Sequence, residues 1–190
     1  MFASKDHLAY SNYFSSIKSM EYRKLDDHLK RRVIFLLNEA KLNSPRDQAI
    51  TFVMRVLSNH ASVKFDGDSL RIKENNLRVS EAALQELYKA EKFEDWGKIT
   101  INEHPHPLKV TWEWMKANAS TLTEEQVWGE FINYPMVTVL RSEDVQLNRL
   151  GLRAHGNSEE RYSQAGISLS LLDKPPKLIW KAKCLPTRTP

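Results

Sequence analysis

Residues 22–41, YRKLDDHLKRRVIFLLNEAK, carry the clearest periodic pattern in the chain. Apolar residues recur there at steps of three and four, with mostly polar residues between them, as in an amphipathic helix with one buried face. The apolar positions are Leu25, Leu29, Val33, Leu36, Leu37 and Ala40. This stretch therefore predicts a long helix that contributes one side of a hydrophobic core.

A second helix and then a change of period follow this stretch. Ser44, followed by Pro45, has the form of a helix start, and the helix is expected to reach about residue 60 with Phe52 among its buried residues. Residues 62–73 then alternate on either side of an Asp-Gly pair, which accepts the backbone angles of a tight turn. We expect a β-hairpin at 62–73.

The pattern downstream completes an α+β fold. Thr123 to Gln126 has the form of a capping box, and strands are expected at 136–140, 167–172 and 178–184. We therefore expect a helical N-terminal half with one β-hairpin, and a C-terminal lobe with short helices and a small antiparallel sheet.

The run His-Pro-His-Pro is the strongest break in the pattern and suggests a boundary between lobes. The predicted division is a mostly helical lobe at 1–102, a hinge at 103–107, an α+β lobe at 108–185 and a disordered tail at 186–190. One compact domain is the alternative.

Composition excludes several classes of protein. Cys184 is the only cysteine, so neither a disulfide within the chain nor a thiolate zinc site can form. No apolar run approaches the ~20 residues that span a bilayer, and the first residues lack a basic leader followed by an apolar segment. We expect a cytoplasmic protein that does not enter a membrane.

The positive charge is local. The net charge is +4, yet residues 174–190 hold five lysines and arginines and no acid. The rest of the chain has 23 basic and 24 acidic residues. Basicity is thus a property of the C-terminal segment, which can contact a few phosphates but cannot supply a long electrostatic groove.

Two basic groups are candidate nucleic-acid contacts. The first lies on the helix at 22–41, and the second on the strand expected at 178–184 and the residues before it. Their members are Lys24, Arg31, Arg32, Lys177, Lys181 and Lys183. The order helix, helix, hairpin also occurs in winged-helix DNA-binding modules. Against this interpretation, the segment outside 174–190 lacks the usual excess of positive charge.

His104 and His106 are candidate metal ligands. In extended chain, residues two apart point the same way, so both imidazoles can reach one ion. A catalytic zinc needs a third ligand, for which Glu103, His60 and His155 are the candidates. The alternative is a proline-stiffened linker that binds nothing.

A nuclease-like interpretation of residues 34–41 is weaker. Glu39 and Lys41 have the Glu-x-Lys spacing of metal-dependent nucleases, with Asp26 or Asp27 as the upstream acid. The helical period of the segment, however, places Glu39 and Lys41 on different faces.

Trp112 and Trp114 are candidate partner-binding residues. Two positions apart on a helix, they point about 200° apart, so one core cannot bury both and one is expected to face a partner.

The chain contains neither a Gly-x-Ser-x-Gly elbow nor a glycine-rich phosphate loop. We expect a non-enzymatic accessory or adaptor protein without a cofactor. It binds a protein partner and, through the basic C-terminal strand, nucleic acid. The alternative function is a metal-dependent hydrolase or nuclease that uses His104 and His106.

Overall fold

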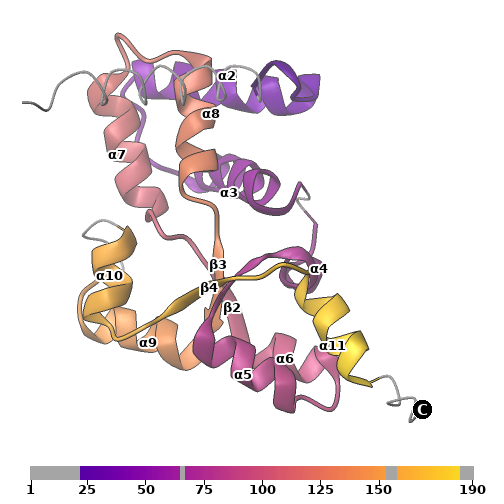
Figure 1. Cartoon of the computed structure of the whole chain (residues 1–190). Helices are drawn as coiled ribbons and strands as arrows, with labels where there is room; N and C mark the ends of the chain where they lie inside the picture. Colours follow the sequence, from indigo (N-terminus) through magenta and orange to yellow (C-terminus); the bar gives the residue numbers. More distant parts are fainter. Residues whose placement is uncertain (1–21, 65–66, 153–157, 185–190) are drawn as a thin grey trace, which may run out of the picture.

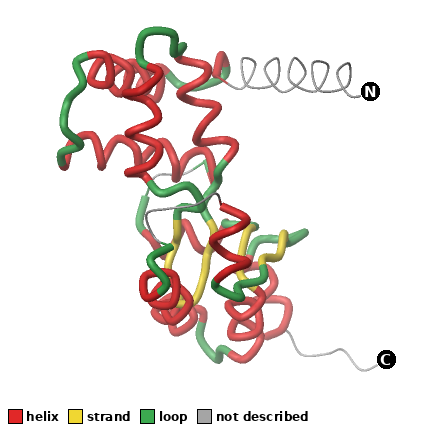
Figure 2. The backbone as a smooth tube through the Cα atoms, turned by 90° about the vertical axis from the view of Figure 1, so that its left-hand side faces the viewer, coloured by secondary structure: helices red, strands yellow, loops and turns green. Residues whose placement is uncertain are grey.

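The computed structural model describes residues 22–64, 67–152 and 158–184. It has two lobes: a helical bundle, and a lobe in which shorter helices surround a small sheet (Figure 1, Figure 2). The expected α+β class with a small sheet is confirmed. None of the described helices is long and apolar enough to cross a membrane.

The bundle contains α2 (Asp27–Lys41), α3 (Gln48–Val63), α7 (Leu108–Asn118) and α8 (Glu124–Asn133). The apolar stripe predicted at 22–41 is confirmed, because all of its members are buried in the bundle core, although α2 begins at Asp27 and Leu25 precedes it. The capping box of α8 is also present, with the Thr123 side chain and main chain both bonded to Gln126. Local pattern therefore predicted the buried face of α2 and the start of α8.

The start and the exposed face of α3 differ from the prediction. Asp47, not Ser44, caps this helix, and its carboxylate accepts a hydrogen bond of 2.8 Å from the Ile50 amide. Phe52, which the periodicity predicts as buried, is 61% exposed. The bundle covers the neighbouring stripe of α3 through Ile50, Met54 and Leu57, so Phe52 faces outward.

The sheet contains β1 (Arg78–Ser80), β2 (Thr100–Glu103), β3 (Val137–Leu140) and β4 (Leu169–Leu171), in the order β2-β3-β1-β4. β1 and β3 are parallel, whereas β2 with β3 and β1 with β4 are antiparallel. The predicted antiparallel sheet is therefore wrong in one pairing, since the sheet is mixed.

Shorter helices cover this sheet and extend the lobe (Figure 1). They are α4 (Ser69–Asn75), α5 (Glu81–Lys89), α6 (Phe93–Ile99), α9 (Arg141–Arg149), α10 (Ser158–Gln164) and α11 (Pro176–Cys184). Two small cores lie here. One joins α9 and α10 to β3, and the other centres on Phe93 and Trp96 and takes up Trp180 of α11.

The predicted hairpin at 62–73 is wrong. α3 continues to Val63, and α4 occupies the place of the second strand, while 65–66 lie outside the described residues. The Asp68 carboxylate caps α4 by accepting from the amides of Leu70 and Arg71, at 3.0 and 3.1 Å. A local cap thus overrides an alternation of only a few residues.

The strand predicted at 178–184 is also wrong, because these residues belong to α11. Pro176 occupies the first position of the helix, where proline's fixed φ angle is favourable. As a helix, the segment places Ile179 and Trp180 together against the Phe93 core. The other two strand predictions are confirmed with shorter bounds, as β3 and β4.

The chain passes from one lobe to the other after α3, after β2 and after α8, within the residues that the structure describes. The bundle core accordingly combines residues 22–57 with residues 112–131. The halves 1–102 and 108–185 therefore each contribute to both lobes, and 103–107 form one of the three connections. Motion at 103–107 stays a prediction, and the tail at 186–190 lies outside the described residues.

Candidate functional site

The connection at 103–107 is held by a buried ion pair. Arg161 of α10 is fully buried and donates to Oε1 of Glu103 at 2.7 Å. The Tyr162 hydroxyl donates to Oε2 of the same carboxylate. Burial raises the pKa of Glu103, and the positive charge of Arg161 opposes that rise. The ion pair ties α10 to the end of β2.

The remaining donors of Arg161 bind main-chain carbonyls. They reach Leu152 at 2.5 Å, His104 at 3.0 Å and Pro105 at 2.5 Å. A buried guanidinium needs such partners, because its donors have no water to bind. Arg161 is thus a structural residue, and no signal in the sequence singled it out.

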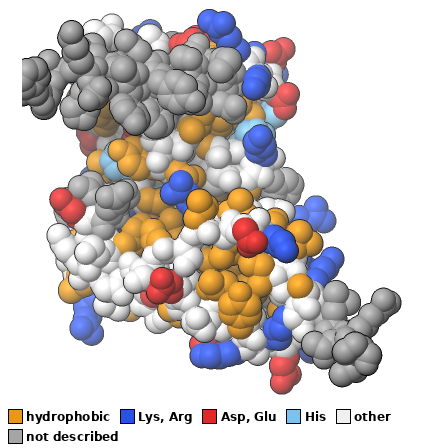
Figure 3. All heavy atoms as spheres, in the orientation of Figure 1, with side chains coloured by type: hydrophobic (Ala, Val, Ile, Leu, Met, Phe, Trp, Pro, Cys, Tyr) orange, Lys and Arg blue, Asp and Glu red, His pale blue; other side chains and the backbone are white. Residues whose placement is uncertain are grey.

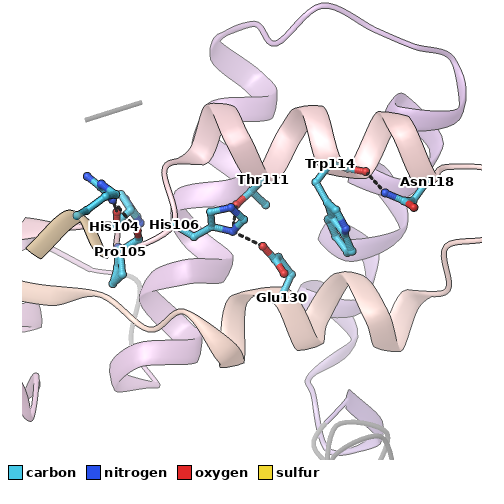
Figure 4. A network of polar contacts seen from close by, with 8 residues as sticks. His104, Pro105, His106, Thr111, Trp114, Asn118 and Glu130 are labelled. Carbon is cyan, nitrogen blue, oxygen red and sulfur yellow. Dashed lines mark hydrogen bonds and ion pairs between the residues drawn. The ribbon is translucent and has the colours of Figure 1, made fainter. Parts of the chain in front are cut away.

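The two candidate metal-binding histidines contact different helices. Nδ1 of His104 lies 3.0 Å from the Ser58 hydroxyl of α3, whereas Nδ1 of His106 lies 2.5 Å from Glu130 of α8. Figure 4 shows the His106 ring pointing toward Glu130. Burial, with the charges of Arg55 and Arg161, lowers the pKa of His104 to about 4, so its ring is neutral at neutral pH.

This arrangement does not assemble the predicted zinc site. Among the described residues, no group of three or more His, Cys, Asp or Glu side chains is placed to hold a metal ion. Of the three candidates for the third ligand, Glu103 is engaged by Arg161 and Tyr162, and His60 packs near Trp128 with ring centroids 6.4 Å apart. His155 lies outside the described residues.

Trp112 and Trp114 both face the bundle. Trp112 is fully buried, and its indole nitrogen donates to the Ser44 carbonyl at 3.2 Å. Trp114 is partly buried against the same core and points from α7 toward α8 (Figure 4). Trp112 therefore has no exposed ring, whereas Trp114 stays partly exposed, and partner binding through it remains a prediction.

The basic C-terminal group is largely engaged within the molecule. Lys177 lies 3.5 Å from both Glu74 and Glu94, and its ammonium sits 4.3 Å from the Phe93 ring centroid. Lys183 donates to the carbonyl of residue 90 at 2.7 Å, while Lys181 is exposed. Lys177 and Lys183 thus help to hold α11 against the lobe, which leaves fewer positive charges of this group to contact a phosphate backbone.

The basic group of Lys24, Arg31 and Arg32, at the start of the bundle, lies mostly at the surface. Lys24 and Arg31 are exposed, and Arg32 donates to the His28 carbonyl at 3.3 Å. The structure does not bring this group together with the lysines of α11, because α2 lies in the bundle and α11 at the far end of the other lobe (Figure 1).

The open edge of the sheet was not singled out by the sequence. β4 is the last strand of the sheet and pairs with β1 alone among the described strands. The bonds from Leu172 to Leu77 and from Glu81 to Ser168 set the register, in which Ser170 faces Val79. In antiparallel pairs the main-chain groups alternate, so those of Leu169 and Leu171 point away from β1.

Apolar side chains surround this edge. Leu169 and Leu171 share one face of β4 and are 41% and 74% exposed. Leu77 and Leu178 nearby in the lobe are exposed as well. Figure 3 shows hydrophobic side chains gathered over the front of this lobe, where β4 runs toward α11 in Figure 1. Alternation predicted the strand, but only the sheet order shows that it is an edge.

A cavity of about 600 Å³ adjoins β4. Its walls include Tyr134, Tyr162, Ile167 and Leu169, together with Arg78 of β1. Arg78 faces Leu171 across the strand pair, is exposed and forms no ion pair with another described residue. Within the described part of the chain, the site thus combines outward-facing main-chain groups, an amphipathic cavity and one cation without an ion pair.

Comparisons of the chain with protein-family models, with curated proteins and with solved structures gave no match.

Proposed function

We propose that this protein is a non-enzymatic adaptor that binds an extended segment of a partner protein along β4. The observation that carries the proposal is the outward-facing main chain of Leu169 and Leu171 on the last strand of the sheet. An added strand pairs with such an edge through main-chain hydrogen bonds, whereas adjacent pockets select its side chains.

The surroundings of β4 specify the chemistry of the partner segment. The exposed Leu169 and Leu171 favour apolar side chains at alternate positions of the added strand. The cavity beside Leu169 accommodates one larger apolar or aromatic side chain. Arg78 favours a carboxylate on the same segment. The expected ligand is an extended, apolar and acidic peptide.

Selection from a displayed library of random peptides tests this function. We expect the selected peptides to alternate apolar residues and to carry an acid. Leu171→Pro is the decisive variant, because it removes an outward N–H while leaving the hydrogen bonds of Ser170 to β1 in place. Affinity for the selected peptides should fall about tenfold or more, since a main-chain donor is lost and the added strand is blocked.

Two further variants complete the experiment. Arg78→Gln should weaken acidic peptides and leave neutral ones unchanged. Leu150→Ala, which removes a comparably exposed leucine at the end of α9, should leave all affinities unchanged. Peptides that bind Leu171→Pro as tightly as the unchanged protein, or a library that yields no binders, would contradict strand addition.

A further inference from the structure

A basic groove lies where α3, β2 and the start of α7 meet. It encloses about 350 Å³, and Arg46, Arg55 and Lys109 are among the residues that line it. A second hollow of about 590 Å³ shares Arg46, Thr51 and Arg55 with the first. The two hollows therefore adjoin along α3, and together they define a track on this side of the helix.

The cations of this groove have few internal partners. Among the described residues, Arg55 and Lys109 form no ion pair, and Arg46 donates only to the Thr51 hydroxyl, at 3.3 Å. The N-terminal segment that contains α3 is basic as well, because residues 22–64 hold nine lysines and arginines against four aspartates and glutamates. Unpaired cations in a concave surface attract anions more strongly than scattered surface charges do.

The acids near the groove are partly occupied. Glu103 is bound by Arg161 and Tyr162, and Asp47 accepts the Ile50 amide as the cap of α3. Asp144 of α9 also lines the groove and opposes an anion there. Arg161 balances the charge of Glu103, whereas Asp47 and Asp144 keep their negative charges. Three cations against these two acids leave the groove with a small positive excess.

An exposed aromatic ring lies on the same track. Phe52 lines the second hollow, is 61% exposed and stands one helical turn from Arg55. Residues three apart on a helix are surface neighbours, so the ring and the guanidinium face the same ligand. Cations that follow a phosphate backbone, next to an aromatic ring on which a base stacks, are the two elements of single-strand recognition.

We propose that this groove binds single-stranded nucleic acid, with Arg46, Arg55 and Lys109 on phosphates and Phe52 stacked on a base. Bases in a duplex are already stacked on one another and offer no free face to Phe52. A lone phosphate would use the cations and leave the ring unused. This site is separate from the peptide site at β4 and does not depend on it.

Fluorescence anisotropy with a labelled oligothymidine of about 15 nucleotides tests the site. Binding is measured between about 50 and 200 mM salt, so that the slope of log K against log salt counts the phosphate contacts. Arg55→Gln/Lys109→Gln should reduce that slope by about 1.4, at about 0.7 for each lost contact with a single strand. Phe52→Ala should weaken binding on the order of tenfold with an unchanged slope.

A matched control separates this site from diffuse attraction. Lys89→Gln/Lys92→Gln removes the same charge from the exposed end of α5 and the residue before α6, in the other lobe. It should leave the slope and the affinity nearly unchanged. All the substituted residues are exposed, so far-ultraviolet circular dichroism of each variant should match the unchanged protein.

Several outcomes would overturn the proposal. Equal losses in the two double variants would show diffuse attraction, and an unchanged affinity of Phe52→Ala would remove the stacked base. Tighter binding of a duplex of the same length, or displacement of the oligonucleotide by inorganic phosphate at equal phosphate concentration, would each exclude a single-strand site. No binding at the lowest salt would end the proposal outright.

Discussion

Lys73 is a buried cation that joins α4 to β2. Its side chain is 3% exposed, and its ammonium donates to the carbonyls of Gly97 and Thr100, at 2.6 and 2.8 Å. These carbonyls lie at the end of α6, where the helix leaves acceptors without partners in the helix. Burial, with the nearby charge of Arg141, lowers the pKa of Lys73 to about 8.

This lowered pKa predicts an unusual pH dependence of stability. From about pH 8 to about pH 10 the unfolded chain keeps the lysine proton that the folded protein has lost. The free energy of unfolding contributed by Lys73 should therefore rise with pH over this window, by about 2 kcal/mol. Urea unfolding of the unchanged protein and of Lys73→Met at several pH values measures the difference.

Lys73→Met should be less stable at neutral pH, because two carbonyls lose their donor, and it should lack the rise above pH 8. Subtracting the free energies of unfolding of the two proteins removes the contribution of tyrosine titration, because that contribution is the same in both. Parallel pH profiles would show that Lys73 keeps its ordinary pKa in the folded protein.

At the scale of secondary-structure elements, the start of α8 is the clearest case of a structure set by neighbouring residues in the sequence. The Thr123 hydroxyl accepts from the Gln126 amide at 3.3 Å, and the Gln126 side chain accepts from the Thr123 amide at 2.8 Å. Both bonds lie within four residues, so the sequence alone could predict them.

Thr123→Ala should lower the free energy of unfolding by about 1 kcal/mol, since one amide at the start of α8 loses its acceptor. Ser120→Ala is the control, because Ser120 is exposed in the preceding turn and should change stability by less than about 0.5 kcal/mol. Denaturant unfolding of both variants checks the difference. Equal effects would show that the capping box contributes nothing in solution.

Two short elements show where local pattern fails. Residues 69–73 and 178–184 carry alternations that fit a strand, yet both segments belong to helices. As helices they bury Lys73 against α6 and pack Trp180 against Phe93, contacts between residues far apart in sequence. Short segments take the conformation that their distant neighbours stabilise, because their own preference amounts to only a few tenths of a kcal/mol per residue.

At the scale of the whole molecule, Arg161 links α10 to the connection between the lobes. Arg161→Met would leave the Glu103 carboxylate buried without its counter-ion. We expect the free energy of unfolding to fall by about 3–5 kcal/mol, as for other buried pairs that lose one partner. Denaturant unfolding of this variant and of Glu103→Gln/Arg161→Met measures the cost.

The pH dependence identifies the cause of that loss. Without Arg161, the pKa of Glu103 should rise further above its unfolded value, since burial then acts unopposed. Stability would be retained at low pH and lost as pH rises through the raised pKa. The double variant should remove this pH dependence and recover part of the stability. Equal pH profiles for the single and double variants would contradict the assignment.

By itself, the sequence determined the fold class, the long helix α2 with its buried stripe, the capping box of α8 and the strand β3. These features depend on periodicity and on hydrogen bonds between residues a few positions apart. It also indicated His104 and His106, but not that their rings contact different helices.

Only the tertiary structure decided which surfaces are open. Arg161 and Glu103 are 58 residues apart in the sequence. β4 is an edge strand because the other three strands all lie on one side of it in the sheet. Phe52 lies outside because the bundle covers a different stripe of α3. Each outcome depends on long-range packing, which determines the face that an amphipathic element buries, whereas local pattern determines only that such a face exists.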